Sequence, residues 1–444
     1  MRVEASRGSS RRIGIGIIGW GTIGSGVIRL LREDAERLSA RLGARIDLVR
    51  VADLDLERRR EVRVPRSQLS RDARSLITDP AIDVVVELMG GLEPARTFVL
   101  DAIAAGKAVV TANKALLAHH GREIFAAAEA ARTGFGFEAS VGGGVPIIRT
   151  LREALGSDRH LAVFGIVNGT SNYILSTMAA EGRGFAEVLA AAQAAGLAEA
   201  DPTYDVDGID AAHKLALLAQ LAFGVALPLD AIGSEGIRQI DAIDMEYARE
   251  FGFAIKLLAI ARDHGDSIEA RVHPAMIPMT DPLANVGGAF NAICLQSAAL
   301  GRTLYYGQGA GMMPTATAVV ADILDVARDR LLDGPRLPPL GYPVAQQRRL
   351  KVKALETLSS EYYLRIGVRD VPGVLGAIAG HLGRAGVSIA SVVQREGGLG
   401  QGVPVVIRTH SAPEKAVRRA LARVAALDSV AAPPVAIRIE ATQG

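Results

Sequence analysis

The sequence predicts an α/β protein with three parts: a parallel-sheet domain, an α+β middle section and a small C-terminal α/β unit. Strand-like and helical segments alternate through the first third of the chain, which is typical of βαβ units. The length of 444 residues favours two or three domains rather than one. After about residue 361 the segments follow the order βαββαβ, which indicates a ferredoxin-like arrangement.

The N-terminal elements follow from apolar runs and the residues that end them. Arg12–Ile18 forms a strand-like run, a helical pattern extends from 27 to about 42, and 46–52 is a second strand that ends at Asp53. The same alternation continues with an apolar run at 81–88, a helix over about 95–105 and a strand at 108–111. We expect residues 1–140 to form this domain, completed by a long helix within 310–333.

The rest of the chain divides at changes of composition. Residues 141–309, in which helices alternate with strands, are expected to form a catalytic and dimerisation domain. Residues 334–360 are rich in proline and basic residues and are the best linker candidate. In the C-terminal unit, 361–444, the expected strands and helices are listed in chain order: 362–368, helix 374–385, 389–394, 403–408, helix 412–425 and 435–440.

Composition excludes several classes of protein. A formal net charge of +2 gives no reason to expect nucleic acid as a partner, and no apolar run reaches the roughly 20 residues that span a bilayer. The basic first dozen residues lack an apolar segment typical of a secretory signal, so we interpret them as a frayed terminus. The single cysteine, Cys294, rules out an internal disulfide and fits a cytoplasmic protein.

A glycine-rich loop follows the first strand and carries the pattern Gly19-x-Gly21-x-x-Gly24. Between a strand and a helix, this pattern indicates a Rossmann-type dinucleotide site. Gly19 permits the tight turn, Gly21 lets the backbone approach a pyrophosphate, and Gly24 lets helix and strand pack closely. The start of the helix supplies amides for the phosphates.

The sequence leaves the choice between NAD and NADP open. Asp53, at the end of the second strand, is placed to accept a hydrogen bond from a ribose 2′-hydroxyl, which favours NAD. Arg58, Arg59 and Arg60 follow closely and could instead hold a 2′-phosphate. The residues expected to contact the cofactor are Gly19, Gly21, Thr22, Ile23, Gly24, Asp53, Gly90, Lys114 and Gly311.

Four further segments narrow the function, because the glycine loop alone fits many dehydrogenases. They are Thr111-Ala-Asn-Lys114, Glu138-Ala-Ser-Val-Gly-Gly-Gly-Val-Pro146, Val167-Asn-Gly-Thr-Ser-Asn172, and Gly196-Leu-Ala-Glu-Ala-Asp-Pro202 continued by 205–214. In this order, over about residues 12–330, the chain closely resembles homoserine dehydrogenase. The C-terminal stretch, with its Asp370-x-Pro-Gly373 turn, resembles an ACT domain. No aspartate kinase-like segment precedes the glycine loop, as in the monofunctional form.

The resemblance implies an activity and a set of site residues. It implies NAD(P)H-dependent interconversion of L-aspartate 4-semialdehyde and L-homoserine, in the biosynthesis of threonine, isoleucine and methionine. It implies that Lys114 lies by the nicotinamide, that Glu199 binds the substrate amino group as a buried carboxylate, and that Lys214 is the proton donor with Asp210 beside it. A monovalent cation such as sodium is implied, largely through backbone carbonyls, near Glu138, Val141, Gly143 and Val145.

The chemistry of aldehyde reduction agrees with these roles. Negative charge develops on the oxygen that receives a proton, so a cationic acid such as Lys214 stabilises the transition state. Asp210 and Lys214 are four residues apart on one predicted helix face, with Asp207 as its N-cap. By spacing alone they could equally be a surface ion pair. Only seven of the 50 basic residues are lysine, so a retained lysine suggests a need for an amine.

The acidic residues before Lys214 suggest a site for an amine-bearing substrate. Asp205 is a candidate substrate-binding residue, although it, Asp201 and Asp207 could equally be turn or cap residues. Two other functions stay open. A phosphorylating semialdehyde dehydrogenase would need an activated cysteine, whereas Cys294 lies in an apolar stretch typical of a buried residue. A non-catalytic dinucleotide sensor with an ACT effector domain would not need Lys214, Asp210 and Glu199 together.

The C-terminal unit and the apolar strands of the middle section predict regulation and assembly. Threonine is the plausible effector, since the implied pathway ends there, and we expect it to bind where the turn at Gly373 opens a helix. Strands of the middle section could pair between subunits, so we expect a homodimer or, through ACT pairing, a homotetramer. Deletion after about Ser360 is expected to leave a folded dehydrogenase.

Overall fold

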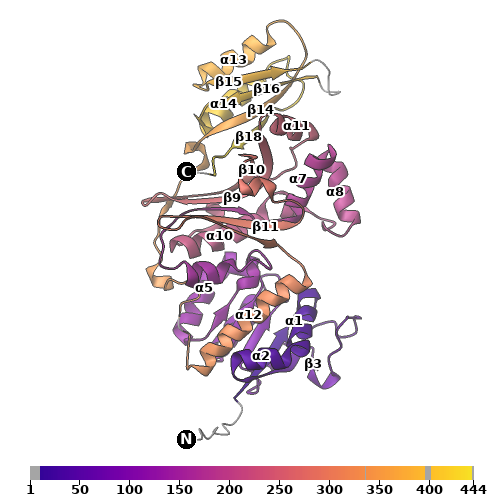
Figure 1. The fold of residues 1–444 in the computed structure, drawn as a ribbon, viewed down its shortest axis with the longest axis vertical. Helices are drawn as coiled ribbons and strands as arrows, with labels where there is room; N and C mark the ends of the chain where they lie inside the picture. The colour runs from indigo at the N-terminus through magenta and orange to yellow at the C-terminus, as the bar shows by residue number, and fades with distance from the viewer. Residues whose placement is uncertain (1–10, 336, 396–401, 443–444) are drawn as a thin grey trace, which may run out of the picture. The chain divides into compact units, whose positions relative to one another are not determined.

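A computed structural model describes residues 11–335, 337–395 and 402–442 (Figure 1). The segment interpreted as a frayed terminus lies almost wholly outside the described residues. The chain divides into two compact units, of which the first comprises 1–161, 213–229 and 291–349 and the second the remainder. Among the described residues, none of the helices combines the length and apolar character that crossing a bilayer requires.

A six-stranded parallel sheet forms the base of the first unit. Its strand order, β3-β2-β1-β4-β5-β6, is that of a Rossmann-type domain and confirms the predicted fold. The strands are β1 (Arg12–Ile18), β2 (Arg45–Ala52), β3 (Leu69–Ser70), β4 (Val84–Glu87), β5 (Ala108–Thr111) and β6 (Phe135–Gly136). Strands β3 and β6 have two residues each, so they are too short to be predicted from an apolar pattern in the sequence.

Helices connect these strands, and a hairpin of longer strands follows later in the chain. The helices are α1 (Thr22–Glu33), α2 (Ala35–Leu42), α3 (Arg74–Ile77), α4 (Ala95–Ala104), α5 (Lys114–Ala131), α6 (Ile147–Arg149) and α12 (Met312–Leu331). The hairpin strands are β11 (Phe290–Ser297) and β12 (Gly301–Gln308), and helix α10 (Ile209–Phe223) runs from the second unit into the first.

The single helix predicted over 27–42 is wrong in two respects. The helix ends before Asp34, because the φ of −106° and ψ of 15° at this residue lie outside the helical region, and α2 begins at Ala35. The first helix also begins earlier, at Thr22, and includes Gly24 and Gly26. Glycine disfavours helices, but a Cβ on Gly26 would lie 2.9 Å from the Ala316 side chain, so close packing of α1 on α12 requires it.

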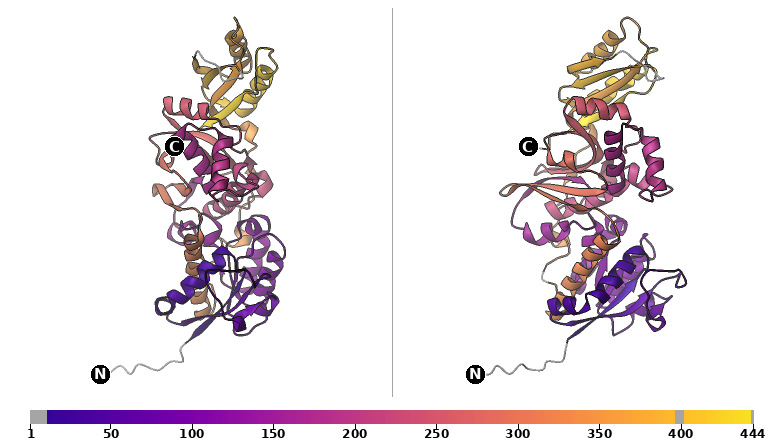
Figure 2. Two further views of the ribbon diagram at one scale, coloured as in Figure 1. Left: turned by 90° about the vertical axis from the view of Figure 1, so that its right-hand side faces the viewer. Right: turned by 45° about the vertical axis from the view of Figure 1, so that its right-hand side comes forward.

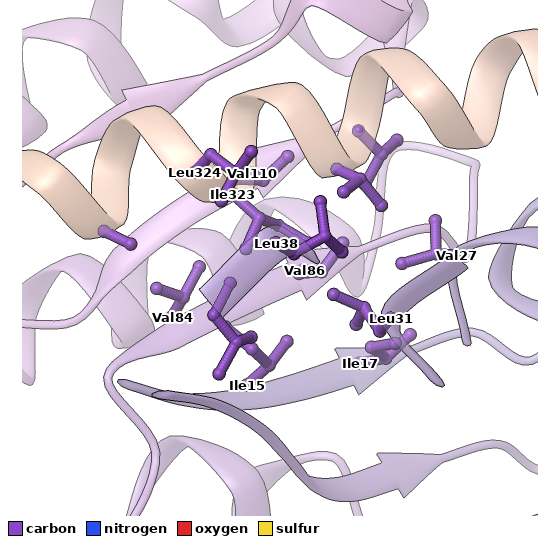
Figure 3. Packing of buried hydrophobic residues seen from close by; sticks show 14 of the residues in the cluster. Ile15, Ile17, Val27, Leu31, Leu38, Val84, Val86, Val110, Ile323 and Leu324 are labelled. Atoms are coloured by element: carbon purple, nitrogen blue, oxygen red, sulfur yellow. The ribbon is translucent and has the colours of Figure 1, made fainter. Parts of the chain in front are cut away.

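The core of the first unit joins the sheet to α1 and α12 (Figure 3). Ile15 and Val84 on the strands and Val27 on α1 are fully buried, together with Ile323 on α12. Each such side chain contributes roughly 1.5–3 kcal/mol relative to an exposed position. Figure 2 shows α12, in orange, running along the indigo and purple elements, so a helix from residue 312 onward completes a core that begins at residue 12.

A mixed sheet organises the second unit, in the order β7-β9-β10-β18-β14-β16-β15. Its strands are β7 (His160–Ile166), β9 (Phe253–Asp263), β10 (Ser267–Pro278), β14 (Ser359–Val368), β15 (Ile389–Gln394), β16 (Val403–Thr409) and β18 (Val435–Ile439). The helices are α7 (Gly169–Glu181), α8 (Phe185–Ala194), α9 (Thr203–Val206), α11 (Ala242–Glu250), α13 (Val374–Arg384) and α14 (Glu414–Ala425). From β14 to β18 the order βαββαβ is confirmed.

The C-terminal strands continue the sheet of the middle section (Figure 1). Strand β18 pairs in parallel with β10, with Ala275 opposite Arg438, and antiparallel with β14. Within the expected linker, β13 (Lys351–Val352) also pairs with β10. Deletion after Ser360 would therefore strip β10 of a hydrogen-bonded neighbour, which argues against the expectation of an independently folded remainder.

Buried charges cross the same junction. The Arg438 guanidinium, 3% exposed, donates to both carboxylate oxygens of Glu235, each at 2.9 Å, and to those of Glu414 at 2.7 and 2.9 Å. The side chain of Arg365 likewise donates to the fully buried Asp244 at 2.7 and 3.0 Å. Because a buried charge that loses its partner is costly, these pairs bind the C-terminal unit to the middle section.

Candidate active site

The glycine loop after β1 has the geometry that its pattern predicts. Gly19 has φ +103°, and a Cβ there would lie 2.6 Å from the Leu88 carbonyl carbon. A Cβ on Gly24 would lie 2.3 Å from the Gly19 oxygen, whereas a Cβ on Gly21 would meet no atom within 4 Å. Gly19 and Gly24 are therefore required by the fold, and Gly21 borders open space that suits a pyrophosphate.

The first turn of α1 presents backbone amides beside this space. Gly21 is the N-cap and makes no side-chain cap, and the first helical bond runs from Ser25 N to Gly21 O at 2.9 Å. The amides of Thr22, Ile23 and Gly24 consequently precede the helix's own hydrogen bonding, and the helix dipole favours an anion there. The residues present fit the phosphates of a dinucleotide.

Two glycine substitutions separate binding from folding at this loop. We expect Gly21→Ala to keep its melting temperature, since the new methyl group meets open space, while the KM for the cofactor rises on the order of ten-fold or more. Gly24→Ala should instead lose about 1–3 kcal/mol of stability, because the methyl group overlaps a backbone oxygen. Thermal melts and steady-state kinetics distinguish the two, and an unchanged cofactor KM in Gly21→Ala would contradict the assignment.

Asp53, predicted to accept from the ribose, holds the loop through both of its carboxylate oxygens. Its Oδ2 accepts from Trp20 N at 2.6 Å, and its Oδ1 accepts from Asp55 N at 2.9 Å. The Arg60 guanidinium lies 3.3 Å from Oδ1 and 4.3 Å above the Trp20 ring. Arg60 is thus committed to Trp20 and Asp53, whereas Arg58 is exposed to solvent.

A buried network at the ends of β4 and β5 was missed in the sequence. Glu87 accepts from the Thr111 hydroxyl at 2.6 Å and from the amides of Met89 and Gly90 at 2.9 and 3.2 Å. Burial raises the pKa of Glu87, while these hydrogen bonds oppose the shift. The signal was present, because Glu87 and Thr111 end neighbouring parallel strands, where ligands approach such sheets.

The same network leads to Lys114. Asn113 caps α5 by accepting from Leu116 N at 3.0 Å, and its amide donates to the Gly91 carbonyl at 2.7 Å. Gly90 and Gly91 both have φ +74° and border open space. Lys114, the first residue of α5, therefore starts a helix that is tied to the predicted cofactor loop at Gly90.

The predicted cation loop lies in the first unit and follows a buried carboxylate. Glu138, 4% exposed, accepts from the amides of Ile148 and Arg149 at 2.8 Å each, and its own amide donates to Asp322 Oδ2 at 2.7 Å. Burial raises the pKa of Glu138, and burial together with the Glu138 charge raises the pKa of Asp322 to about 7.

Backbone carbonyls rather than side chains would have to hold a cation there. In the part of the chain that the structure describes, no group of three or more histidine, cysteine or acidic residues is arranged as a metal site. Gly143 has φ +57°, and a Cβ there would lie 2.4 Å from the Gly309 oxygen, so the turn that contains Val141 and Val145 is tightly packed. Glu138 and Asp322 are already engaged by backbone amides and, for Asp322, by the Arg149 side chain. Gly311, predicted to contact the cofactor, is the N-cap of α12 with φ +129°.

The second unit brings together two of the predicted acidic residues. Asn168 Nδ2 donates to Asp205 Oδ1 at 2.7 Å and to Asp210 Oδ2 at 2.9 Å. Asp205 comes from α9 and Asp210 from the first turn of α10. Burial and the charges of Asp210 and Asp205 raise the pKa of Tyr204 to about 12. This arrangement attracts a cationic group.

The other aspartates of this stretch have structural roles. Asp201 Oδ1 accepts from Thr203 N at 3.1 Å, which makes a local turn. Asp207, expected to cap the next helix, accepts from the Arg238 side chain at 2.5 and 3.3 Å. Of the three aspartates left open by the sequence, only Asp205 joins the cluster around Asn168.

Lys214 and Asp210 are buried, which argues against a surface ion pair. Asp210 is 3% exposed and Lys214 9% exposed, on the same face of α10 because they are four residues apart. Asp210 joins the cluster around Asn168.

The exposure of Glu199 differs from the prediction. As a carboxylate facing a substrate ammonium it was expected to be buried, but it is exposed on the turn between α8 and α9. Only its backbone carbonyl is held, by Gln193 Nε2 at 3.0 Å. The cause is local: 195–200 is glycine- and alanine-rich and contributes little apolar surface to anchor it.

Cys294 is buried within strand β11, 1% exposed, with the Arg302 guanidinium 3.0 Å from its sulfur. A nucleophilic cysteine needs access to its substrate. This site therefore does not support the chemistry of a phosphorylating semialdehyde dehydrogenase.

Comparison with known proteins agrees with this geometry. Residues 19–138 match the family model for the NAD-binding domain of homoserine dehydrogenase, 146–324 match the homoserine dehydrogenase model, and 362–426 match the ACT domain model. The homoserine dehydrogenase of Neisseria gonorrhoeae is 46% identical over 430 residues, which cover 96% of this chain and 98% of the relative. The corresponding Synechocystis enzyme is 43% identical over 432 residues, covering 96% and 99%.

A solved structure extends the likeness to three dimensions. The crystal structure of a homoserine dehydrogenase from Thiobacillus denitrificans superimposes with a TM-score of 0.91 at 46% identity, covering 97% of this chain and 98% of that one. The likeness thus covers the dinucleotide-binding domain, the middle section and the C-terminal βαββαβ unit together. The chain belongs to the homoserine dehydrogenase family, as an NAD(P)-dependent oxidoreductase of amino-acid biosynthesis with a C-terminal ACT domain.

Proposed function

We propose that this enzyme interconverts L-homoserine and L-aspartate 4-semialdehyde, with Lys214 as the proton donor and Asp205, Asp210 and Glu199 as the groups that bind and orient the substrate. The observation that carries the proposal is the pair of carboxylates that Asn168 holds, one of which, Asp210, lies four residues before the buried Lys214. Two negative charges suit the α-ammonium group of homoserine. An enzyme for a neutral alcohol or aldehyde would not need such a pair of carboxylates.

The residues of the chain divide the work of the reaction. When bound, the nicotinamide cofactor supplies or accepts the hydride. The Lys214 ammonium donates its proton to the aldehyde oxygen during reduction, and as an amine it takes the proton from the hydroxyl group during oxidation. Its positive charge also stabilises the oxygen as negative charge develops. Asp210, on the same helix face, favours the charged form of the lysine, and Lys114 orients the nicotinamide.

Steady-state assays test this proposal directly. Purified protein should oxidise L-homoserine with NAD or NADP, without added phosphate or thiol, and should discriminate against 4-hydroxybutanoate, which has the hydroxyl group and the carboxylate but no ammonium. Equal turnover of both alcohols would remove the role of the carboxylate pair.

We further propose that the enzyme uses both cofactors, with a slight preference for NAD. Asp53 repels a 2′-phosphate, while Arg58 and Arg59 attract one. Asp53→Ala is expected to raise the NADP/NAD ratio of kcat/KM by roughly ten-fold, equivalent to about 1.4 kcal/mol. The matched control is Asp55→Ala in the same loop, which should leave the ratio unchanged. A ratio unaffected by Asp53→Ala would place the ribose elsewhere.

The ACT domain suggests that an amino acid regulates the enzyme, and we propose threonine. The helix α13 starts at Gly373, which has φ +87° and makes no side-chain cap, so the first amides of an eleven-residue helix face outward from the turn at 370–373. Threonine at millimolar concentration should inhibit the full-length enzyme, and calorimetry should detect binding. Absence of both effects would assign the domain a different ligand.

The remaining proposals concern ions, assembly and location. A sodium ion would be held mainly by carbonyls of the turn that contains Val141, Gly143 and Val145, next to Glu138. We propose a homodimer or homotetramer in the cytoplasm, acting in threonine, methionine and isoleucine biosynthesis. Sedimentation of the full-length protein tests the assembly.

A further inference from the structure

Both polar atoms of the buried Asn168 side chain form hydrogen bonds. It is 5% exposed and forms the N-cap of α7, where Oδ1 accepts from Ser171 N at 2.8 Å. Its Nδ2 donates to Asp205 at 2.7 Å and to Asp210 at 2.9 Å. One carboxamide therefore caps a helix and bridges two carboxylates.

Chemistry fixes the orientation of this carboxamide. A rotated amide would turn its oxygen toward two carboxylates and its nitrogen toward the Ser171 amide, so that acceptors would face acceptors and donors would face donors. The two N–H groups must therefore face Asp205 and Asp210. Hydrogen bonds of this kind to a carboxylate favour its ionised form.

The backbone of Asp205 is tied to the same helix turn. The Ser171 hydroxyl donates to the Asp205 carbonyl oxygen at 2.9 Å. The first turn of α7 thus fixes both the main chain and the side chain of Asp205, and fixes the side chain of Asp210 as well. Two like charges this close would otherwise repel each other and favour protonation of one carboxylate.

We propose that Asn168 is a positioning residue that holds Asp205 and Asp210 as a pair of ionised carboxylates and so sets the affinity of the site for the substrate ammonium group. A neutral amide suits this task. A lysine or arginine in its place would neutralise the pair and compete with the substrate, and an acidic residue would add repulsion. The inference rests on the proposed function and names what orients its carboxylates.

The test uses Asn168→Ser in the full-length enzyme. Serine keeps an oxygen that can cap α7, but it removes both N–H donors and adds no charge. We expect the KM for homoserine to rise about ten-fold or more, equivalent to about 1.4 kcal/mol, with a smaller change in kcat. The KM for the cofactor should not change.

Two further variants keep the result interpretable. Asn168→Asp also keeps a strong cap but adds a third negative charge, so it should lose more activity, and it replaces Asn168→Ser should that variant not fold. Asp241→Ser alters the N-cap of α11 in the same unit and should keep wild-type kinetics. Melting temperatures of all variants record any loss of capping.

The outcomes separate the inference from the proposed function. If Asn168 only caps α7, Asn168→Ser lowers the melting temperature but leaves the homoserine KM unchanged, and the inference fails while the function stands. If wild-type enzyme does not turn over homoserine, both fail. A raised homoserine KM, with a smaller change in kcat and an unchanged cofactor KM, supports the inference.

Discussion

Replacement of Lys214 by alanine is expected to lower kcat on the order of a hundred-fold or more. The substitution removes both the proton donor and the positive charge that faces the developing oxyanion, and each of these contributions is typically of that size. The KM for homoserine should change much less, because Asp205 and Asp210 remain in place on Asn168. Initial rates with saturating cofactor measure both quantities.

A matched variant tests whether charge alone suffices. Lys214→Arg keeps a cation but offers a guanidinium that does not release its proton near neutral pH, so it should remain strongly impaired. The control is Lys415→Arg on helix α14, which should behave as wild type. Lys256→Arg is not used as the control, because Lys256 is buried and the larger side chain would disturb its packing. A Lys214→Ala enzyme with near-normal kcat would show that a different group delivers the proton.

Replacement of Arg438 by alanine is expected to destabilise the second unit by about 3–5 kcal/mol, because it leaves the carboxylates of Glu414 and Glu235 without their buried partner. Arg418 is the matched control. It contacts the same two carboxylates, but its side chain is 55% exposed, so Arg418→Ala should cost no more than about 1 kcal/mol.

Chemical denaturation and the melting temperature compare these variants. Adding Glu414→Gln to Arg438→Ala should restore part of the loss, since it removes one unpaired charge. Equal destabilisation by Arg438→Ala and Arg418→Ala would mean that burial of this network does not determine its strength. Because Glu235 lies in the middle section and Arg438 on β18, the same experiment measures how firmly the C-terminal unit is attached.

Much of the fold could be predicted because its signals are local. The strand Arg12–Ile18, the glycine loop and the βαββαβ order each leave a pattern within a few residues. The interruption of the helix at Asp34 could not be predicted from the sequence, because small differences in backbone preference decide whether a helix continues through such a residue. Strands β3 and β6, with two residues each, exist only because neighbouring strands supply their hydrogen bonds.

The candidate site shows the same limit. The pattern predicted which acidic residues precede Lys214, but it could not say which of them converge, because Asp205 and Asp210 meet through Asn168, 37 and 42 residues earlier in the sequence. The burial expected of Glu199 failed because exposure depends on packing around a loop. The network of Glu87 and Thr111 was overlooked because each residue ends an apolar strand and resembles an ordinary strand end.

One assay tests the central claim most directly: reduction of L-aspartate 4-semialdehyde by NADPH and NADH, with the product identified, for wild type and for Cys294→Ala. The structure predicts stoichiometric formation of L-homoserine, with no requirement for phosphate, and comparable rates for both proteins because Cys294 is buried in β11. Formation of no homoserine, or phosphate-dependent chemistry that disappears in Cys294→Ala, would contradict it.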